Sequence, residues 1–568
     1  MVSSLGQSIS RISFSHSQHP VVRRADWRFL LDNPTPQRSI VFEGGLLAEA
    51  VSMISASTIV SGSNQSGDDH DLAVAVNPTE KILATINSSL KPGGFCYLEW
   101  QVNNFFHTST IKNQLTSSGF DYIKLYLAMP TPDKIYTDIW IPIDSKGAVE
   151  FTIVENLRVG TNNHIKHLAK IMRYLLWKIW PNLLIAYPYL LSSKRKYTIA
   201  SIASKCIPTH RQTTRQHIHN NMIGNKINDD NLYQIIDTTI KNEWQYLGLK
   251  SKPDKISALM LCNEGSKDQI ILYIFADEIR IPSLVVKIAR TKDSIPVVSS
   301  EATNLESIQA RFPNLEGIPR VLFCIDDGRL FAQARPYVNG VPFSGVVKER
   351  NRLELCLRVT SWLIRLARNT ATDVPPDWRE SLIDPVLSTL TPLFSSKLSR
   401  DQLQKTCQKV SSLNLSYLVC EHRDLSPWNI IIDHEGKIGV IDWEVARLNG
   451  LPAADLILFL TYVNYHFDKT WEKQNFSESY RNMLDISTPA GRIFNECMEL
   501  YSSKLNISKS EIDSIRLLTW LGQLYRRIDR DYKSAPEIKL PLNEDENITL
   551  ALWEVELETQ KTLNCTQR

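Results

Sequence analysis

Residues 420–444 place three polar side chains around two short apolar runs, in an order that constrains the local fold. Asp424 lies in a short loop after an apolar segment, and Asn429 opens a predicted strand five positions later. The turn that follows contains Gly436, which can adopt a positive φ and reverse the chain. A second predicted strand then leads to Asp442. We therefore expect a β-hairpin with Asn429 and Asp442 at adjacent ends, where both can bind the same metal ion.

These three residue types suit the transfer of a phosphoryl group from ATP. Catalysis of that reaction depends mostly on positioning and on neutralising the charge of the phosphate oxygens. Mg²⁺ prefers hard oxygen ligands, which the carboxylate of Asp442 and the amide oxygen of Asn429 would supply. Asp424 would accept the proton of the attacking hydroxyl, or orient that hydroxyl. The alternative is a hairpin with unrelated acidic residues at its ends, which the match in order and spacing disfavours.

The motif reads His-Arg-Asp at 422–424, then Asn429, then Asp-Trp-Glu at 442–444. Protein kinases carry H-R-D-x-x-x-x-N followed by D-F-G. The Asp-Trp-Glu segment, together with Ser-Pro-Trp at 426–428, makes this stretch resemble the aminoglycoside phosphotransferase and choline kinase branch of the kinase-like fold. The resemblance implies an α+β, bilobal, protein-kinase-like C-terminal domain that uses ATP and Mg²⁺. It also implies that the catalytic loop is supported by His422 and Asp455.

An apolar strand at 282–290 carries Lys287, and a lysine inside such a strand is costly unless it is paired or faces a ligand. Because the strand resembles the V-A-I-K strand of kinases, Lys287 would reach the α- and β-phosphates. Its expected partner is Glu301 on the next helix, with Glu306 as the rival, and a solvent-facing lysine on an edge strand is a further alternative. The other nucleotide-binding candidates are Gly265 and Ser266 in the phosphate-covering loop, and Gln333 and Arg335 at the expected hinge.

The first 200 residues have a different pattern, because predicted strands and helices alternate between 38 and 99. This alternation predicts a mostly parallel sheet with flanking helices. The segment Leu-Lys-Pro-Gly-Gly-Phe-Cys-Tyr-Leu-Glu at 90–99 resembles class I S-adenosylmethionine-dependent methyltransferases, in which this turn leads into a central strand. On that resemblance, 120–129 and 136–142 would supply the last antiparallel strands of a Rossmann-like α/β domain.

This N-terminal part departs from the methyltransferase pattern in its cofactor-binding positions. A G-x-G loop lets the backbone approach the cofactor closely, but only Gly44 and Gly45 follow the first strand. No carboxylate that could bind ribose hydroxyls follows Val60. We therefore interpret the domain as a degenerate, non-catalytic scaffold. A working methyltransferase that binds S-adenosylmethionine (SAM), or an unrelated α/β domain, is the alternative.

Two further segments have unusual compositions. Residues 167–191 form an aromatic, apolar and basic pattern, which a helix in a membrane interface can show. We favour a helical insertion packed on its own domain, because the apolar positions nearly surround the helix. The histidines at 209–219 could suggest a metal site, but histidine pairs without supporting acids or cysteines favour a solvated linker.

Composition limits the remaining possibilities. A chain of 568 residues is too long for one core and suggests two to four domains. The net charge of +3 gives no reason to expect nucleic-acid binding. Nine scattered cysteines without C-x-x-C pairs indicate neither zinc nor a disulfide framework, and favour a reducing cytoplasm. Neither a signal peptide nor a spanning helix is expected.

These observations predict the organisation and function of the chain together. The expected parts are a disordered lead-in at 1–24, a degenerate methyltransferase-like domain at 25–200, a linker at 201–230, a kinase-like small lobe at 231–335 and a large lobe at 336–568. The expected activity is ATP-dependent phosphorylation of a small-molecule hydroxyl, such as that of a sugar, an aminoglycoside-like compound or an amino alcohol. The alternatives are a nucleotide-binding pseudokinase, a methyltransferase with an accessory kinase-like domain, and a protein kinase, which the lack of a clear A-P-E segment disfavours.

Overall fold

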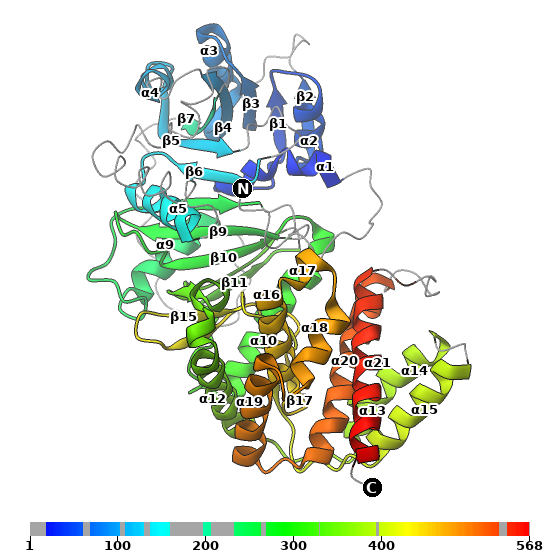
Figure 1. Cartoon of the computed structure of the whole chain (residues 1–568). Coiled ribbons are helices and arrows are strands. Elements are labelled where there is room, and N and C mark those ends of the chain that lie inside the picture. The colour runs from blue at the N-terminus through cyan, green and yellow to red at the C-terminus, as the bar shows by residue number, and fades with distance from the viewer. Residues whose placement is uncertain are drawn as a thin grey trace. The chain divides into compact units, whose positions relative to one another are not determined.

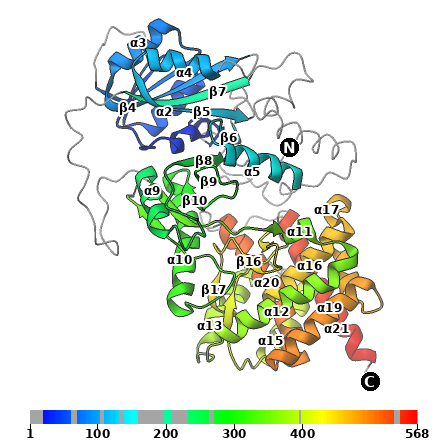
Figure 2. The same cartoon turned by 90° about the vertical axis from the view of Figure 1, so that its left-hand side faces the viewer.

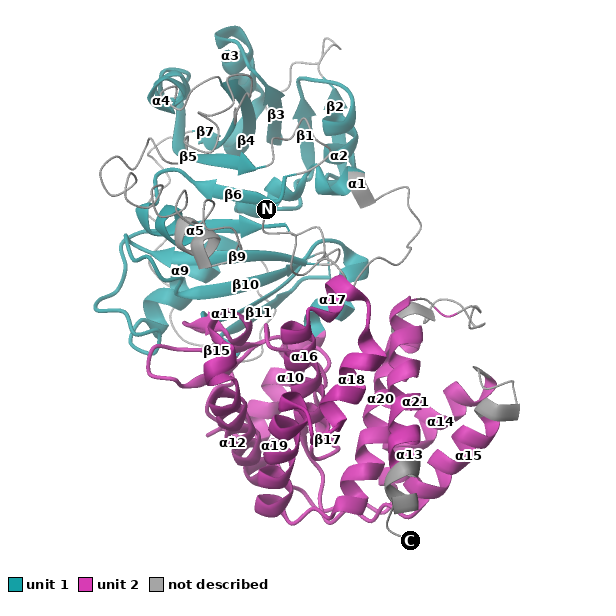
Figure 3. Ribbon diagram, in the orientation of Figure 1, with its two compact units in different colours: residues 1–299, 321–337 teal, residues 300–320, 338–568 magenta. Residues whose placement is uncertain are grey.

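The computed structural model describes residues 19–60, 69–102, 108–129, 137–158, 197–205, 232–262, 269–328, 330–393, 397–532, 542 and 544–566. It divides into two compact units (Figure 3). Unit 1 comprises Met1–Ser299 and Val321–Tyr337, and unit 2 comprises Ser300–Arg320 and Val338–Arg568. The N-terminal region and most of the segment expected to form the kinase-like small lobe, 231–335, therefore fall in the same unit.

Unit 1 is built on one twelve-stranded sheet, with strand order β11-β12-β10-β9-β8-β6-β5-β7-β4-β3-β1-β2 (Figures 1 and 2). The strands are β1 (Arg38–Val41), β2 (Ser57–Val60), β3 (His70–Val76), β4 (Leu90–Val102), β5 (Phe120–Met129), β6 (Ile139–Pro142), β7 (Tyr197–Lys205), β8 (Ile256–Leu261), β9 (Gln269–Ala276), β10 (Leu284–Ala289), β11 (Phe323–Asp326) and β12 (Phe331–Pro336).

The first four strands, β1 to β4, are parallel to one another, as the βαβ alternation predicts. Helices α2 (Leu46–Ile54) and α3 (Glu80–Ser89) connect them. The antiparallel strand of this half is β7, which lies between β4 and β5 and pairs with both. β5 and β6 are antiparallel to their neighbours in the sheet, as expected for these segments, and β5 points the same way as β4.

Residues 201–205, expected as the start of a linker, form the second half of β7. Their sequence mixes serine and lysine with small apolar residues, so it lacks the apolar run of a typical buried strand. Nevertheless Ser201 is fully buried in the sheet, because strands pair with β7 on both sides. Tertiary pairing thus decides the conformation of a segment whose own sequence is indifferent.

The two halves of the sheet join where β6 pairs with β8, through Ile139 with Leu261 and Trp140 with Met260. The core continues across this joint. One apolar layer contains side chains from β3 and β4 together with others from β8, β9, β10 and β12, and it is covered by α2, the 3₁₀ helix η1 (Asp26–Leu30) and α9 (Leu232–Glu243). The opposite layer is covered by α3, α4 (Thr108–Ser117) and α5 (Lys146–Arg158).

The segment around η1 connects both halves of the sheet. Trp27 stacks on Tyr97 of β4 at 3.9 Å between ring centroids. Arg24 donates two hydrogen bonds to Glu99, at 2.6 and 2.7 Å, and both side chains are buried. On the other half, Asp26 accepts a hydrogen bond from Arg290, just after β10, at 3.2 Å. This segment therefore contacts β4 in one half of the sheet and the residue that follows β10 in the other half.

The expected lead-in at 1–24 only partly fits this arrangement. Residues 1–18 lie outside the described residues, whereas α1 (His19–Arg23) is helical. Arg23 and Arg24 are 7% and 8% exposed, and Arg23 donates a hydrogen bond to the carbonyl oxygen of Cys262 at 2.8 Å. Long polar side chains can be buried when their charges are paired, so a polar composition alone gave the wrong expectation for 19–24.

Unit 2 is mostly helical, with a three-stranded sheet β13-β15-β16 and a β14-β17 pair (Figures 1 and 2). Its strands are β13 (Val341–Pro342), β14 (Val419–Glu421), β15 (Ile430–Ile432), β16 (Ile438–Val440) and β17 (Arg447–Gly450). Its helices are α11 (Phe343–Val346), η5 (Glu349–Asn351), α12 (Arg352–Thr370), α13 (Trp378–Leu382), α14 (Asp384–Leu390), η6 (Thr391–Leu393), α15 (Lys397–Ser411), α16 (Ala454–Asp468), α17 (Thr470–Lys473), α18 (Phe476–Leu484), α19 (Pro489–Leu505), α20 (Lys509–Tyr532) and α21 (Glu544–Thr566).

Helix α10 (Ile295–Arg311), preceded by η4 (Lys292–Ser294), begins in unit 1 and ends in unit 2. Among the described residues, no helix combines the length and the apolar character that crossing a membrane requires. The predicted helix at 167–191 lies outside the described residues, so its interfacial and packed alternatives both stay open.

Candidate active site

The predicted hairpin is present in unit 2 as β15 and β16. Ile430 pairs with Val440, and one step further the backbone N–H of Ile441 donates to the carbonyl oxygen of Asn429 at 2.9 Å. This register places Asn429 and the residue after Ile441, Asp442, at the same end of the hairpin. The turn at the other end contains Gly436 with φ of 79°, as the turn chemistry predicts.

Asn429 is joined directly to Asp424. Its Nδ2 atom donates to the backbone carbonyl oxygen of Asp424 at 2.9 Å, and lies 3.4 Å from the carboxylate Oδ2. With the amide nitrogen used in this way, the amide oxygen of Asn429 is the atom left to bind a cation. An oxygen from Asn429 and a carboxylate from Asp442 form a donor set that fits Mg²⁺, whose other ligands are commonly water and phosphate oxygens.

Asn429 and Asp442 would be the two protein ligands of the predicted Mg²⁺ site. No group of three or more His, Cys, Asp or Glu residues in the described part of the chain could hold a metal ion by itself. The donor set at the hairpin would thus need oxygens from a bound nucleotide to complete the coordination of Mg²⁺.

Two residues of the site have backbone conformations that are uncommon for side chains with a Cβ. Arg423 has φ of 67° and Asp442 has φ of 74°. Such conformations cost free energy and persist where the surrounding structure holds them. Around Arg423 the constraint comes from its own backbone, since its N–H donates to Asp455 Oδ1 at 2.8 Å and its carbonyl oxygen accepts from Gln523 Nε2 at 2.9 Å.

His422 is fully buried and connects the loop to the hairpin. Its Nε2 lies 3.0 Å from the carbonyl oxygen of Ile441, and its Nδ1 accepts from the backbone N–H of Asp424 at 3.3 Å. One nitrogen therefore donates and the other accepts, which a neutral imidazole can do and an imidazolium cannot. Burial lowers the pKa of His422 to about 4, which keeps the ring neutral near pH 7.

Asp455, in the first turn of α16, holds the backbone of the same loop. Its Oδ2 accepts from the N–H of His422 at 2.6 Å, and its Oδ1 accepts from that of Arg423. Burial raises the pKa of Asp455, neighbouring Glu421 raises it further, and the two N–H donors oppose the shift. These contacts are those of the loop-supporting role that the sequence predicts for His422 and Asp455.

Helix α20 brings Arg526 to the site. Arg526 Nη2 lies 3.8 Å from Asp424 Oδ1, and it donates to Gln523 Oε1 at 2.5 Å. Burial raises the pKa of Asp424, and the charge of Arg526 opposes that shift. No motif in the sequence singles out Arg526. It lies about a hundred positions from Asp424, so only the fold brings the two together.

Aromatic side chains extend the surface next to the loop. Trp428, which precedes Asn429, is 39% exposed. Its ring packs edge-on against Tyr462 of α16, with centroids 5.6 Å apart. Tyr462 in turn lies nearly parallel to Trp471, at 6.5 Å.

The predicted nucleotide-binding lysine lies in unit 1. Lys287 is in the middle of β10, opposite Ile271 of β9 and Gln333 of β12, and is 5% exposed. This placement excludes the alternative of a lysine on an edge strand. Glu301 lies in unit 2 and is buried, whereas the rival Glu306 is exposed, so burial favours Glu301. The pairing of Lys287 with Glu301 stays a prediction.

The other nucleotide-binding candidates are less clearly placed. Gly265 and Ser266 lie outside the described residues. Gln333 and Arg335, expected at a hinge, are buried in β12 at 1% and 5% exposure. Gln333 donates to the carbonyl oxygen of Val298 at 3.3 Å. The two units divide after Tyr337, and the placement of Gln333 and Arg335 at a hinge stays a prediction.

The site therefore groups the carboxylate of Asp424, the predicted cation ligands Asn429 and Asp442, and buried supporting residues in the pattern expected of a phosphotransferase. Residues 274–483 match the model of the phosphotransferase enzyme family. This match supports a small-molecule phosphotransferase at the level of the family. It includes Lys287, Asp424, Asn429 and Asp442. It begins well after residue 200, so it gives no support to the resemblance to methyltransferases. No curated protein matches the sequence.

Several solved structures are similar to part of the chain. An aminoglycoside phosphotransferase from Streptomyces rimosus is 15% identical, with a TM-score of 0.31, and the match covers 51% of this chain and 97% of that one. A macrolide 2′-phosphotransferase from Brachybacterium faecium is 16% identical, with a TM-score of 0.32, covering 54% and 99%. A putative fructosamine-3-kinase from Haemophilus somnus is 13% identical, with a TM-score of 0.34, covering 57% and 96%. Because these TM-scores are low, the proposed function is supported by the family match and by the residues of the site, and not by these structures.

Proposed function

We propose that this protein transfers the γ-phosphoryl group of ATP to a hydroxyl group of a small molecule. The observation that carries the proposal is the contact of Asn429 with Asp424 at the end of the hairpin that also bears Asp442. It brings a proton acceptor next to a cation-binding pair, within a region that matches the phosphotransferase enzyme family. Either feature alone would support a weaker conclusion.

Each residue has a defined part in this proposal. Asp424 accepts the proton of the acceptor hydroxyl as its oxygen attacks the γ-phosphorus, and the bond from that phosphorus to the bridging oxygen of ADP breaks. Lys287 binds the α- and β-phosphates. Asn429 and Asp442 would hold Mg²⁺, which neutralises charge on the phosphate oxygens. His422 and Asp455 keep the loop in its strained conformation, so Asp424 stays in place.

We assign a structural role to the N-terminal half of unit 1. Its apolar layers continue into the kinase-like strands, and the segment around η1 connects both halves through buried ion pairs. It therefore extends the sheet that carries Lys287. The alternative of SAM binding can be tested by titrating the full chain with SAM in a calorimeter. Saturable heat would contradict a purely structural role.

The proposed activity is tested by measuring ATP consumption with Mg²⁺ against sugars, amino sugars, amino alcohols, nucleosides and hydroxy acids. Asp424→Asn serves as the blank because it keeps the size of the side chain and removes the proton acceptor. The proposal expects turnover with one acceptor class that the blank lacks. A pseudokinase would instead bind Mg·ATP, seen as a rise in melting temperature, without turnover of any acceptor.

A further inference from the structure

The surface that meets the acceptor is formed by groups next to Asp424. In the proposed reaction the acceptor hydroxyl must lie within hydrogen-bonding reach of the Asp424 carboxylate. Side chains flanking that carboxylate therefore contact the rest of the acceptor. In the described part of unit 2, Arg526 lies next to this carboxylate, and Arg527 and Tyr462 interact with it electrostatically. Trp428 packs against Tyr462.

The two oxygens of Asp424 face different surroundings. Oδ2 is the oxygen nearest Asn429, at 3.4 Å, which is the side of the cation-binding pair. Oδ1 is the oxygen nearest Arg526, at 3.8 Å. Since Mg²⁺ and the nucleotide belong on the Asn429 side, Arg526 marks the side from which the acceptor approaches.

Arg526 is able to bind an anion there. A guanidinium has five N–H donors. Among described residues, the partners of Arg526 are Gln523, through Nη2, and Asp424 at a distance too long for a hydrogen bond. The side chain is 22% exposed and that of Asp424 is 38% exposed, so solvent and ligands can reach the pair. Donors thus stay available for a carboxylate or phosphate oxygen.

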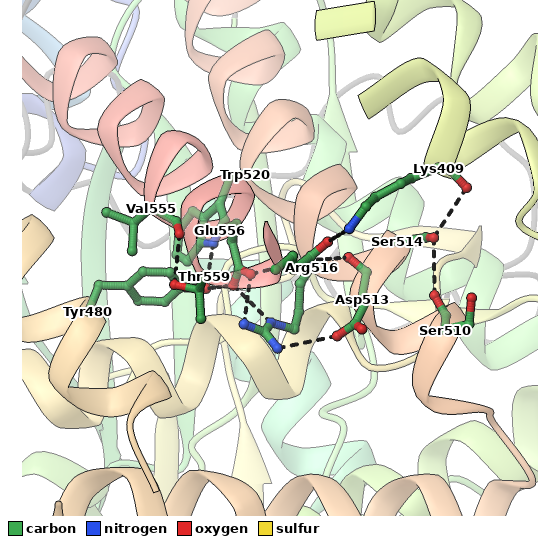
Figure 4. Close-up of polar contacts among 11 residues, drawn as sticks. Lys409, Tyr480, Ser510, Asp513, Ser514, Arg516, Trp520, Val555, Glu556 and Thr559 are labelled. Carbon is green, nitrogen blue, oxygen red and sulfur yellow. Dashed lines mark hydrogen bonds and ion pairs between the residues drawn. The ribbon is translucent and has the colours of Figure 1, made fainter. Parts of the chain in front are cut away.

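Arg526 is also held in a fixed position. Gln523 links it to the backbone carbonyl oxygen of Arg423 in the catalytic loop. Further back along α20, the buried Arg516 pairs with Glu556 of α21 at 2.7 Å, and Tyr480 of α18 donates to the same carboxylate (Figure 4). The helix that carries Arg526 is therefore anchored to its neighbours, and the arginine needs little ordering when it binds a ligand.

The charge around Asp424 disfavours a polycationic acceptor. Arg527, next to Arg526, pairs with Asp545 at 3.6 Å, so its charge is balanced. The charge of Arg526 faces only Asp424 among the described residues. An acceptor with several ammonium groups would meet the charge of Arg526, and the other carboxylate that interacts with Asp424, that of Asp442, is the proposed ligand of Mg²⁺. Tyr462 interacts electrostatically with Asp424 and Arg526, and Trp428 packs against Tyr462. The partly exposed ring of Trp428 is available to an apolar or aromatic group.

We propose that the acceptor carries a carboxylate or phosphate group that binds Arg526, beside a ring or other apolar part that packs on Trp428. This inference rests on the proposed phosphotransferase function and gives the acceptor class. The rival partner for Arg526 is an anionic oxygen of the transferred phosphoryl group. The side of Asp424 on which Arg526 lies favours the acceptor, and the experiment separates the two.

The test uses three hydroxyl compounds that share a phenyl ring and differ in charge: 3-phenyllactate, 3-phenylpropane-1,2-diol and phenylalaninol. Their dissociation constants are measured by calorimetry on the full chain saturated with Mg·ADP. The account expects 3-phenyllactate to bind at least about tenfold more tightly than phenylalaninol, because an arginine–carboxylate pair is charge-assisted. Arg526→Gln should abolish this preference, and Arg526→Lys, which keeps the charge but not the fork, should keep part of it.

Arg481→Gln is the matched control, because Arg481 forms an exposed ion pair with Glu558 away from Asp424. It should leave all three dissociation constants within twofold. Equal binding of the three compounds, tighter binding of phenylalaninol, or no binding of 3-phenyllactate overturns the inference. The affinity of Arg526→Gln for a non-hydrolysable Mg·ATP analogue, which carries the γ-phosphoryl group that Mg·ADP lacks, separates the acceptor from the transferred phosphoryl group as the partner of the arginine. A loss of this affinity assigns the arginine to the nucleotide and also overturns the inference. Failure of Mg·ADP to bind the unmodified chain would instead contradict the proposed function.

Discussion

Asn429 donates from Nδ2 to the carbonyl oxygen of Asp424 at 2.9 Å, and this contact couples the proposed base to the proposed cation site. The amide of asparagine has a donor and an acceptor on one rigid group. The amide nitrogen of Asn429 holds the loop, and its amide oxygen stays available to bind the proposed cation. A residue with only one of these functions cannot do both.

Asn429→Asp should therefore separate the two functions. The aspartate keeps an oxygen ligand for Mg²⁺ but loses the hydrogen-bond donor. Its charge repels the backbone carbonyl oxygen and the carboxylate Oδ2 of Asp424, which Asn429 Nδ2 contacts. We expect Mg·ATP to bind within about threefold of the unmodified affinity, while kcat falls by roughly a hundredfold as the base loses its position. Asn429→Ala should reduce both quantities. Equal losses of binding in the two variants would contradict the separation of roles.

The neutral state of His422 predicts how stability depends on pH. Burial lowers its pKa to about 4, from about 6.5 in the unfolded chain. Because the unfolded state takes up the proton first, this contribution to stability is complete above pH 6.5 and is lost as pH falls from 6.5 towards 4. Between pH 7.5 and 5.5 the free energy of unfolding should fall by about 1.3 kcal/mol through this group.

The measurement is chemical denaturation at both pH values for the unmodified chain and for His422→Gln. The variant is expected to be less stable at both values, since it loses buried contacts. The quantity that decides is the difference between pH 7.5 and 5.5, which should shrink by about 1.3 kcal/mol in the variant. An unchanged difference would mean that His422 titrates near its ordinary pKa.

Two ion pairs that join unit 2 helices to α21 differ in burial and should differ in strength. Glu556 is fully buried and pairs with Arg516, whereas Glu558, two residues on, pairs with the exposed Arg481. Glu556→Gln removes the nearer and fully buried counter-ion of Arg516 and leaves only Asp513, at 3.5 Å, which should cost up to about 3–5 kcal/mol. Glu558→Gln should cost less than about 1 kcal/mol.

Urea denaturation of both variants checks this expectation. If α21 is fixed mainly by the buried pair shown in Figure 4, hydrogen exchange in α21 should also accelerate in Glu556→Gln and not in Glu558→Gln. Similar losses of stability in the two variants would contradict the anchoring of α20 and α21 by the buried pair.

The shared core of unit 1 predicts that its two halves unfold together. Trp27 is fully buried and stacked on Tyr97, so Trp27→Ala should destabilise by about 3–5 kcal/mol. Faster amide exchange should appear in β8 and β9 as well as in β4, because these strands contribute to the same apolar layer. Tyr246→Ala, which removes a ring that is 53% exposed, is the control. Exchange that changes in β4 alone would mean that the halves are independent.

Local features of the fold were predictable from the sequence. The helices at 46–54 and 352–370 and the strand at 70–76 are such features, because apolar periodicity and turn residues lie within each segment. The catalytic hairpin was predictable for the same reason. Its strands, turn and polar ends are all contained in about twenty-five residues.

Features that depend on distant pairing were not predictable. β6 and β8 pair across more than a hundred residues, and nothing local in either strand specifies that partner. β7 is defined by the strands on its two sides, since its own sequence mixes apolar residues with serine, threonine and lysine. Arg526 likewise gains its place only when α20 packs beside the catalytic loop. In each case the signal lies in tertiary contacts that a single sequence does not display.

The most direct test of the central claim is transfer of radioactive phosphate from γ-labelled ATP to the acceptor class that supports turnover, comparing the unmodified chain with Asp424→Asn. The account predicts labelled acceptor with the unmodified chain. It predicts a rate at least about a thousandfold lower for the variant, while the rise in melting temperature with Mg·ATP stays the same. Label transfer at an undiminished rate in Asp424→Asn, or no transfer to any acceptor class by a chain that binds Mg·ATP, would contradict it.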